Sequence, residues 1–408
     1  MIKYNISLKE EGPPPLFLSE KSECLLRKGP LQPAGPLAKQ RRRRTIFVDM
    51  DQKLKKIGQA FRIEGDYLGY EQIKVGNVNQ TYKVTYRQSD GSPKNYIVQR
   101  VNTYAFRQPE ELMHNADMIT EHIRAKKQAG VALHFHHTHD RKTFVYDEEH
   151  GFWRLTNYIP SVTYSGSTDP EILRRTGEAF GAFQRQLSDF PVADLHETIP
   201  NFHNTPKRLE TLFADAERDP VGRASEVREE LAYIASVREE AETLTRLYEA
   251  GKLPLRVTHN DTKINNVLFN RETDEPMVII DLDTVMPGLV GYDFGDGIRF
   301  AANCVAEDCP DTALAKCDLA RFQAFAGGFL SQTADMLTET ERKTLALSVF
   351  SITVELAARF LDDYIVGDQY FNIDYPTHNL IRARCQIALA KDVHEKLDEM
   401  KAYIDTFA

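Results

Sequence analysis

The chain has 408 residues, of which 42% are hydrophobic and 27% are charged. This composition predicts a globular protein with enough apolar material for one large or two moderate domains. The formal net charge of -9 argues against nucleic-acid binding, because phosphate neutralisation needs a surplus of Lys and Arg. We expect a small-molecule partner, and the sequence leaves the oligomeric state open.

The lengths of the apolar runs and the pattern of cysteines favour a cytoplasmic protein. The sequence has no run of eighteen or more apolar residues, and we expect no secretory signal at its N-terminus. The cysteine count is odd, and no two cysteines form a C-x-x-C pair. Free thiols in a reducing compartment therefore fit better than disulfides or a zinc site.

Residues 1–49 differ in composition from the rest of the chain. They contain GPPP, GPLQPAGPL and the run Arg41–Arg44, with few periodic apolar positions. This pattern predicts a disordered leader. The arginine run is expected to be a solvated flexible segment, and binding of an acidic partner is the alternative.

Residues 50–160 are rich in strand patterns. A helix is expected directly after Met50, and another from about Pro109. Strands are expected at YEQIKV (70–75), TYKVTY (81–86) and YIVQRV (96–101), and a second hairpin at ALHFHHTH (132–139) and TFVYD (143–147), followed by WRLTNYIP (153–160). We predict a small antiparallel N-terminal lobe.

Residues 161–408 are mainly helical in pattern. A core helix is expected from Asp169 to Leu187, and residues 207–250 predict two or more solvent-facing helices. Two short apolar runs, LPLRVTHND and PMVIIDLDT, interrupt the helices before a helical C-terminal third. The predicted fold class is α+β, with a strand-rich lobe and a larger helical lobe.

The strongest functional signal is HNDTKINN at 259–266 followed by VIIDLDT at 278–284. Asp261 and Asp281 each end an apolar run, and Asn266 follows Asp261 by five positions, so we expect these side chains to meet in one cleft. Phosphoryl transfer needs a carboxylate that deprotonates the attacking hydroxyl and oxygen ligands for Mg²⁺. Asp261 suits the first task, Asn266 and Asp281 suit the second, and Lys263 can neutralise developing charge. The alternative is that all are turn and capping residues.

This pattern, H-x-D-x-x-x-x-N followed by I-D, resembles the aminoglycoside phosphotransferase and choline kinase superfamily, and within it the N-acetylhexosamine 1-kinases. The resemblance extends from about Met50 to the C-terminal helix and includes FHNTP, DFGDGIRF, RFLDDY and YPTHNLIR. It implies a protein-kinase-like two-lobed fold, ATP and Mg²⁺ as cofactors, and a small-molecule sugar as substrate. It also implies that Asp261 is the general base, that Asn266 and Asp281 bind Mg²⁺, and that His259 supports the catalytic loop.

The resemblance further implies an acceptor pocket. Thr284, Arg359 and Tyr370 are expected to line it and to contact the sugar. Asn77 is expected at the substrate, at a position where the sugar 1-kinases often carry His. Asp293 and Asp296 are expected to brace the active-site loops.

Nucleotide contacts are expected in the N-terminal lobe. Gly76 and Asn79 belong to the turn that covers the phosphates in kinases, although an ordinary hairpin turn explains GNVNQTY equally well. Backbone groups of Asn157 and Tyr158 are expected at the adenine edge. Gln99 stands on the third strand, where most kinases carry a lysine. The hexosamine kinases are similar to this chain at that position, so the missing lysine does not imply an inactive site.

Other polar residues of the same region are expected to have no role in binding or catalysis. Arg100 alternates to the opposite face of the third strand and is a poor substitute for the lysine. Asp117 is expected to be a surface carboxylate rather than an ion-pair partner. His134 and His136 alternate onto one face of a strand, but no partner cluster supports a metal site.

The sequence therefore predicts ATP-dependent phosphorylation of the anomeric hydroxyl of an N-acetylhexosamine. The first alternative keeps the chemistry with another acceptor, such as an amino alcohol, an aminoglycoside, homoserine or a fructosamine. Asp283, Asp362 and Asp363 would then supply an acidic pocket. The second alternative is a non-catalytic nucleotide-binding pseudokinase, suggested by the absent lysine.

Overall fold

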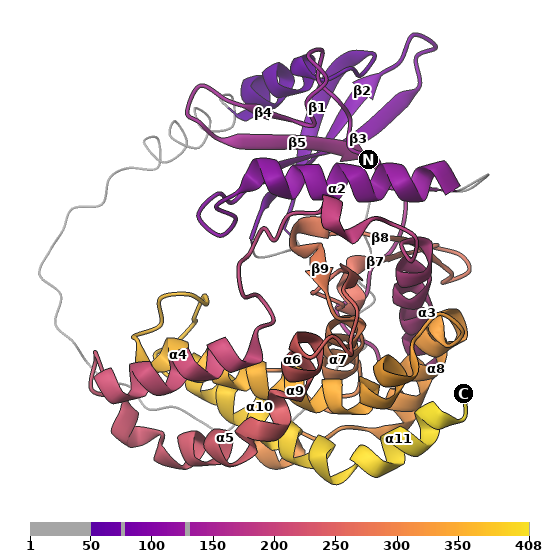
Figure 1. Ribbon diagram of the computed structural model, residues 1–408. Helices are drawn as coiled ribbons and strands as arrows, with labels where there is room; N and C mark the ends of the chain where they lie inside the picture. Colours follow the sequence, from indigo (N-terminus) through magenta and orange to yellow (C-terminus); the bar gives the residue numbers. More distant parts are fainter. Residues whose placement is uncertain (1–49, 75–77, 127–130, 408) are drawn as a thin grey trace, which may run out of the picture. The chain divides into compact units, whose positions relative to one another are not determined.

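The computed structural model describes residues 50–74, 78–126 and 131–407. The chain divides into two compact units (Figure 1). The first contains the chain up to Asn102 together with Phe135–Tyr158, and the second contains Thr103–His134 and Ile159–Ala408. The stretch 103–134, which the sequence pattern assigned to the N-terminal lobe, thus groups with the second unit. The predicted disordered leader, residues 1–49, lies outside the described residues.

A five-stranded antiparallel sheet forms the body of the first unit. The order of its strands is β1-β2-β3-β5-β4 (Figure 1). Their bounds are β1 Asp66–Ile73, β2 Gln80–Arg87, β3 Pro93–Val101, β4 Phe144–Tyr146 and β5 Phe152–Asn157. The three strands predicted between residues 70 and 101 are confirmed, because their alternation of apolar and polar residues matches the two faces of a sheet.

The two faces of this sheet differ in chemistry. One face packs against the helix at residues 50–60 and buries an apolar cluster that includes Leu54, Val84, Val98 and Trp153. Each such side chain contributes about 1.5–3 kcal/mol when it is fully buried. Side chains at alternate positions, among them Gln99, project from the other face. The first face holds the unit together and the second presents polar groups.

The predicted hairpin of residues 132–139 with 143–147 is wrong. Between residues 131 and 139 the chain forms only isolated bridges, from Phe135 to Thr156 and from Thr138 to Phe61. The strand that pairs with β5 at this edge is β4. Because β4 occupies the edge beside residues 152–154 and Phe135 meets only Thr156, no second ladder develops.

Helices dominate the second unit (Figure 1). They are α2 Pro109–Lys126, α3 Pro170–Gln186, α4 Thr205–Arg218, α5 Arg228–Ala241, α6 Thr243–Glu249, α7 Val290–Ala301, α8 Leu319–Thr333, α9 Glu339–Ile365, α10 His378–Glu395 and α11 Leu397–Asp405. The helices predicted from Pro109, from Asp169 and within 207–250 are confirmed. Asp169 caps α3, because its side chain accepts a hydrogen bond from the amide of Glu171 at 2.9 Å.

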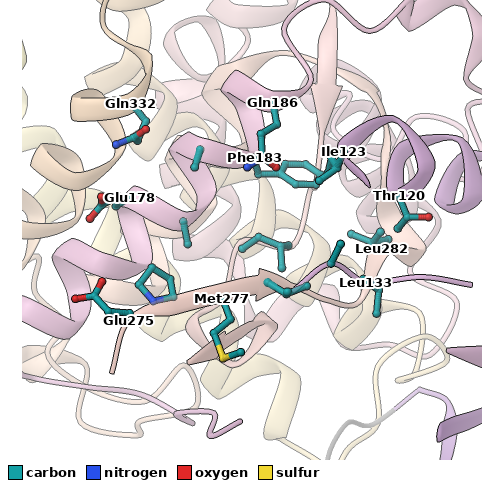
Figure 2. Close-up of a pocket in the computed structure, with 16 residues that line it drawn as sticks. Thr120, Ile123, Leu133, Glu178, Phe183, Gln186, Glu275, Met277, Leu282 and Gln332 are labelled. Carbon is teal, nitrogen blue, oxygen red and sulfur yellow. The ribbon is translucent and has the colours of Figure 1, made fainter. Parts of the chain in front are cut away.

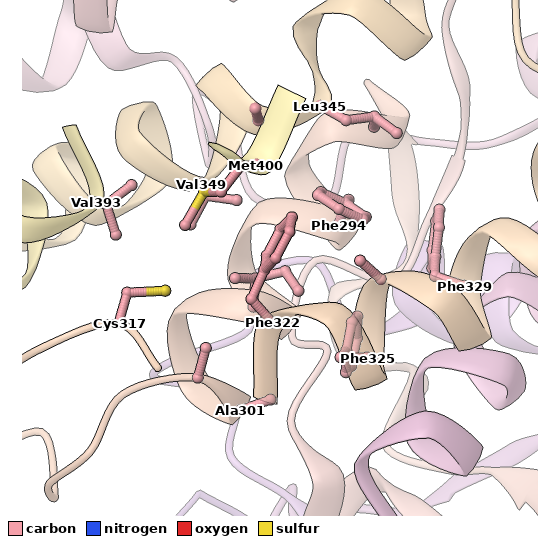
Figure 3. Close-up of a cluster of buried hydrophobic side chains, with 14 of the residues drawn as sticks. Phe294, Ala301, Cys317, Phe322, Phe325, Phe329, Leu345, Val349, Val393 and Met400 are labelled. Atoms are coloured by element: carbon pink, nitrogen blue, oxygen red, sulfur yellow. The ribbon is translucent and has the colours of Figure 1, made fainter. Parts of the chain in front are cut away.

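The core of the second unit lies among α7, α8, α9, α10 and α11. Figure 3 shows Phe294, Phe322, Phe329, Val349 and Met400 in this cluster. Helix α9 is long and apolar enough to cross a membrane, but 78% of its most apolar window is buried inside the structure. This burial is typical of the central helix of a core.

Helices α3 and α8 approach each other closely at glycines. A Cβ atom at Gly177 would lie 2.0 Å from the carbonyl oxygen of Phe325, and one at Gly328 would lie 1.9 Å from that of Arg174. Only glycine permits this backbone contact. The contact fixes α3, which carries Gln184 toward the candidate site.

Four short strands complete the second unit. They form two antiparallel pairs, β6 (Arg256–Thr258) with β9 (Met286–Gly288) and β7 (Val267–Phe269) with β8 (Pro276–Ile279). Both predicted apolar runs therefore contain a strand, but the two strands do not pair with each other. The polar motifs lie in the segments that connect these strands.

Candidate active site

Cross-linking hydrogen bonds join the two polar segments, residues 259–266 and 280–284. The Ile280 amide donates to the Asn266 carbonyl at 2.9 Å, and His259 Nε2 donates to the Ile280 carbonyl at 3.0 Å. The Thr284 hydroxyl donates to the His259 carbonyl at 2.6 Å. The two segments are therefore held together partly by the pairing of β7 with β8, which places Asn266 beside Ile280, and partly by hydrogen bonds between the loops.

Asp261 lies at the centre of the first segment with two partners. Asn266 Nδ2 donates to the Asp261 carbonyl and to its Oδ2, both at 2.9 Å. Lys263 Nζ lies 3.0 Å from Asp261 Oδ1. The Asp261 side chain is 29% exposed, so a carboxylate of fixed orientation remains accessible to a substrate hydroxyl.

Asp293, on the first turn of α7, holds the backbone of this segment. Its carboxylate accepts hydrogen bonds from the amides of His259 at 2.9 Å and Asn260 at 2.8 Å, and from Gln184 Nε2 at 2.7 Å. Burial raises the pKa of Asp293, and the neighbouring His259 and these donors oppose the rise. The carboxylate therefore fixes the backbone of the two residues that precede Asp261.

Asp296 has a similar role about one turn later in α7. It accepts the Thr262 amide at 3.0 Å through Oδ2 and binds Arg299 through Oδ1 at 2.8 Å. Burial acts to raise the pKa of Asp296, but the Arg299 guanidinium, and after it Lys263, bring the pKa below its ordinary value. Asp261 in turn is the main cause of a raised Lys263 pKa. An ionic network therefore extends from α7 to the candidate base.

Asn266 and Asp281 fit a magnesium site by the chemistry of their donor atoms. Because Nδ2 of Asn266 is bound to Asp261, its Oδ1 is the end of the amide that remains for a cation. Asp281 adopts the left-handed conformation, with φ of 60°, which a non-glycine residue holds only when its surroundings enforce it. The described residues contain no group of three or more His, Cys, Asp or Glu suited to a metal, and Mg²⁺ needs only one or two protein carboxylates beside phosphates and water.

A second cluster of the same unit surrounds Arg359, on α9. Its guanidinium lies 5.2 Å from the ring centre of Phe202, 5.9 Å from that of Tyr370 and 5.7 Å from that of Phe371. Tyr370 is 67% exposed. The structure thus brings together two residues predicted to line the acceptor pocket, and it adds two aromatic rings that sequence reasoning missed.

Buried polar groups lie next to the Arg359 cluster. Glu355, one turn before Arg359, accepts hydrogen bonds from His203 Nδ1 at 2.8 Å and from the Thr205 hydroxyl at 2.7 Å. Burial opposes ionisation of Glu355, but His203, and after it Arg359, lower its pKa below the ordinary value. His203 and Thr205 lie in the string FHNTP, which indicates the family but predicts no role for His203, and no sequence signal indicates Glu355.

The Arg359 cluster and the catalytic segment are connected through α7. The His203 ring lies 4.9 Å from the ring of Tyr292, the residue before Asp293. His203 also contributes to the low pKa of Asp296, which binds the Thr262 amide. Arg359 therefore lies on a helix, α9, that packs against α7, the helix that carries Asp293.

Polar atoms without partners collect at the Arg359 cluster. Buried atoms with no hydrogen-bond partner in the described part of the chain include His203 Nε2, Arg208 Nε and Asp362 Oδ1. Burial, and after it the charge of Arg359, lowers the Arg208 pKa. Burial and the neighbouring Asp215 raise the pKa of Asp362 to about 7. These atoms therefore keep unused hydrogen-bonding capacity inside the cluster.

Two other predicted acidic groups are occupied by the protein. Asp363 accepts hydrogen bonds from the amides of Gln369, Tyr370 and Phe371 at 2.7, 2.7 and 2.9 Å. It also accepts one from Asn379 Nδ2 at 2.8 Å. Asp363 thus shapes the loop that carries Tyr370, and Asp283 is 2% exposed.

The predicted nucleotide contacts belong to the first unit. Asn79 Oδ1 accepts the Asn102 amide at 2.9 Å, and Gln99 Nε2 donates to the Thr81 hydroxyl at 3.1 Å. Asn157 ends β5, and Lys83 Nζ lies 5.2 Å from the ring centre of Tyr158. Gly76 and Asn77 lie outside the described residues.

A cavity of about 310 Å³ lies apart from these residues in the second unit. Figure 2 shows Thr120, Ile123, Phe183, Met277 and Leu282 around it. Its mainly apolar lining comes from α2, α3 and β8, and the described residues that line it do not include Asp261, Arg359 or Tyr370. Chemistry is therefore not expected in this cavity.

Comparison with known proteins gives one family match and several structural matches. Residues 69–330 match the profile of the phosphotransferase enzyme family, which is more than half of the chain. The chain is similar to a microcompartment-associated aminopropanol kinase at 16% identity and a TM-score of 0.59, covering 86% of this chain and 98% of the other. It is also similar to a spectinomycin phosphotransferase in complex with ADP and spectinomycin, at 14% identity and a TM-score of 0.55, covering 85% and 98%.

A third solved structure shares the fold. It is an aminoglycoside phosphotransferase from Alicyclobacillus acidocaldarius subsp. acidocaldarius DSM 446, at 13% identity and a TM-score of 0.53, covering 86% of this chain and 96% of the other. At these identities the likeness concerns the fold alone. The predicted kinase-like architecture, a small antiparallel sheet with a larger helical part, is confirmed.

Proposed function

Because the chain belongs to the phosphotransferase enzyme family, we propose that it transfers the γ-phosphate of ATP to the anomeric hydroxyl of an N-acetylhexosamine. The products are the sugar 1-phosphate and ADP. One of the structural relatives was solved with ADP, which supports a nucleotide as the phosphate donor.

Asp261 is the general base of this reaction. Asn266 and Lys263 fix its two carboxylate oxygens, so that the accessible carboxylate orients the acceptor hydroxyl and takes its proton as the new bond to phosphorus forms. The bond between the γ-phosphorus and the bridging oxygen breaks, and the electron pair leaves with ADP. Lys263 stabilises the negative charge near Asp261.

Mg²⁺, when bound, neutralises charge on the transferred phosphate and on ADP. Asn266 Oδ1 and the Asp281 carboxylate would hold it. The bond from the Ile280 amide to the Asn266 carbonyl at 2.9 Å keeps the two segments that carry these ligands in register. Both ligands depend on the Asp293 brace, because it fixes the backbone at His259 and Asn260.

The observation that carries the choice of acceptor is the cationic, aromatic character of the Arg359 cluster. A guanidinium among three aromatic rings and a second arginine, Arg208, would repel an amine. The carboxylates that an amine acceptor would need are weak candidates, since Asp363 is saturated by backbone amides and the Asp362 pKa is raised to about 7. A neutral sugar with an acetamido group suits aromatic rings and hydrogen-bond donors.

A substrate panel tests the proposal. ADP release is measured with GlcNAc, GalNAc, glucose, choline, ethanolamine, homoserine and an aminoglycoside, and phosphorus NMR of the product identifies the phosphorylated position. We expect an anomeric phosphate on an acetamido sugar and turnover at least tenfold above that with any amine. Preferential phosphorylation of an amino alcohol or an aminoglycoside would overturn the sugar assignment and leave the kinase assignment intact.

A cytoplasmic location fits this reaction. Cys304, Cys309, Cys317 and Cys385 are free thiols, which suits a reducing compartment. Cell fractionation, followed by detection of the chain with an antibody, checks this location. Recovery of the protein with membranes or in the medium would contradict it.

A further inference from the structure

Arg299, on α7, is a buried cation that lies between two carboxylates. The residue is 4% exposed. Its Nε and NH2 groups donate to Asp296 Oδ1 at 3.1 and 2.8 Å, and NH1 donates to Glu307 Oε1 at 2.7 Å. Glu307 belongs to the segment between α7 and α8, and its side chain is 33% exposed. The guanidinium is therefore compensated from both sides, as a buried charge requires.

Asp296 connects Arg299 to the catalytic segment. Its Oδ2 accepts the backbone amide of Thr262 at 3.0 Å, and Thr262 directly follows the proposed base, Asp261. Burial acts to raise the pKa of Asp296, and the charges of Arg299 and then of Lys263 lower it. Two cations thus stabilise one buried carboxylate.

Lys263 lies between two carboxylates that can attract it. Its Nζ is 3.0 Å from Asp261 Oδ1. Asp261 is the main cause of the raised Lys263 pKa, burial opposes the rise, and Asp296 is the next cause. The Asp296 side chain is 9% exposed and that of Asp261 is 29% exposed. Because charges attract more strongly where less water surrounds them, an uncompensated Asp296 would draw the flexible Lys263 side chain away from the base.

We propose that Arg299 is a positioning residue for the base: it compensates the Asp296 carboxylate, and Lys263 therefore stays in contact with Asp261. The inference rests on the proposed role of Asp261 as general base and not on the identity of the acceptor. Without Arg299, Lys263 moves toward Asp296. The base then loses the contact that fixes its Oδ1 atom.

A crystal structure of Arg299→Gln tests this without substrate or turnover. We expect Lys263 Nζ within about 3.5 Å of an Asp296 oxygen and more than about 4 Å from both Asp261 oxygens, the limits of a hydrogen bond and of an ion pair. A Lys263 side chain that still contacts Asp261 would overturn the proposal.

Steady-state kinetics measure the consequence for the reaction. In Arg299→Gln, kcat should fall about 10- to 100-fold, because a misplaced base costs rate. The KM values of ATP and acceptor should stay within about threefold, since the base acts mainly in the transition state.

Removal of both charges should restore the reaction. In Asp296→Asn/Arg299→Gln the amide oxygen can still accept the Thr262 amide, and no carboxylate competes for Lys263. Its kcat should lie at least about fivefold above that of Arg299→Gln, a coupling expected for residues in one ion-pair network. If Arg299 only supported the fold, or if its charge acted on the reaction directly, the double variant would be as slow as the single one.

Arg321 provides the matched control. Its NH1 donates to the Asn303 carbonyl at 3.1 Å, so it holds the same segment between α7 and α8 that carries Glu307. Arg321→Gln makes the same exchange of a guanidinium for an amide and should leave kcat within about twofold of the wild-type value, as for most substitutions outside a site. An equal fall in Arg321→Gln and Arg299→Gln would assign the effect to this segment and refute the role of Arg299.

If circular dichroism shows that Arg299→Gln does not fold, Asp296→Asn/Arg299→Gln decides, because it removes both buried charges of the pair. Its crystal structure must then keep Lys263 on Asp261, and its kcat must lie within about fivefold of the wild-type value. A tenfold or larger loss in the folded double variant refutes the proposal. Wild-type protein without turnover on any acceptor would contradict the proposed function alone, since the position of Lys263 in the variant structure still decides the role of Arg299.

Discussion

The candidate catalytic segment at 259–266 and the Arg359 cluster belong to the same unit but differ in how fully their polar groups are hydrogen-bonded. In the first, Asp293 and Asp296 accept hydrogen bonds from backbone amides, and the Thr284 hydroxyl donates to the His259 carbonyl. In the second, His203, Arg208 and Asp362 each keep a buried polar atom without a partner among the described residues. The segment 259–266 contains one such atom among the described residues, Asn265 Oδ1, whereas the Arg359 cluster contains three.

This difference is expected if the first region carries out the reaction and the second selects the acceptor. A base must be held in one orientation before the substrate arrives, because misplacement costs rate. A pocket that recognises a polar acceptor must instead leave its own donors and acceptors open, and their desolvation is compensated only when the right ligand binds. Substitutions in the catalytic segment should therefore lower kcat, and substitutions in the Arg359 cluster should raise the acceptor KM.

Removal of the base is expected to have the largest effect. Asp261→Asn keeps the shape of the side chain but cannot accept the proton, so kcat should fall by about 10³-fold, within the range of general-base catalysis. Affinity for ADP should stay within threefold of the wild-type value. ADP release with acceptor measures the first quantity and calorimetry the second. Acceptor-dependent turnover that survives in the variant would refute the role of Asp261.

The brace behind the base should have the next largest effect. Asp293→Asn presents one carbonyl oxygen where two carboxylate oxygens accept three hydrogen bonds, so at least one N–H group in the core faces another. We expect kcat to fall about 100-fold and the free energy of unfolding to fall by about 2–4 kcal/mol. Urea unfolding and steady-state kinetics measure the two effects.

A capping carboxylate provides the control for Asp293. Asp318 accepts the amides of Ala320 and Arg321 at the start of α8, and Asn is as good a cap as Asp. Asp318→Asn should therefore leave kcat unchanged. A folded Asp293→Asn variant with wild-type kcat would show that the brace does not position Asp261.

The sequence predicted the main strands of the sheet because local patterns determine them. Apolar alternation specifies β2 and β3, and the helical spacing after Asp169 specifies α3. The predicted hairpin of 132–139 with 143–147 failed because β4 pairs with β5 instead, and residues 131–139 form only isolated bridges to Thr156 and Phe61. Alternation of apolar and polar residues alone does not tell which strands pair.

Contacts between distant residues could not be predicted in the same way. Phe202 and Phe371 meet Arg359 only because α4 and the loop after α9 lie side by side in the fold. The hydrogen bond from Arg154 Nε to Gln99 Oε1 could not be predicted for a similar reason, since it depends on the register of β3 and β5, which are separated by about fifty residues. The family resemblance predicted Arg359 and Tyr370, whereas their neighbours Phe202 and Phe371 are identified only in the structure.

Loss of the exposed ring of the Arg359 cluster should have a moderate effect limited to the acceptor. Tyr370→Ala removes a side chain that is 67% exposed, so the free energy of unfolding should change by less than about 0.5 kcal/mol. The acceptor KM should rise about 3- to 10-fold, as expected for one aromatic contact, with the ATP KM unchanged. Initial rates over both substrate concentrations measure this.

Tyr375 provides the matched control in the same loop. It is 39% exposed and stacks on His378 rather than on Arg359. Tyr375→Ala should leave the acceptor KM within twofold of the wild-type value. An equal rise in both variants would assign the effect to the loop as a whole and remove Tyr370 from the acceptor pocket.

The smallest expected effect concerns the pH dependence of stability at Asp362. Burial, and after it Asp215, raises the Asp362 pKa to about 7 from an ordinary value of 3.8. Below pH 4 both the folded and the unfolded states are protonated. Between pH 4 and 7 only the unfolded state ionises, so stability falls as pH rises through this window, and the penalty is complete above pH 7.

Asp362→Asn removes this titration and should stabilise the protein at pH 8 by about 1–2 kcal/mol, which is less than the full conversion of about 1.4 kcal/mol per unit of pKa because solvent screens this partly exposed carboxyl group. Urea unfolding at pH 4, 6 and 8 measures it. The curves of variant and wild type should meet near pH 4 and separate toward pH 8. Parallel curves would mean that Asp362 is ionised throughout, and an acidic acceptor pocket for an amine would again become the better explanation of the Arg359 cluster.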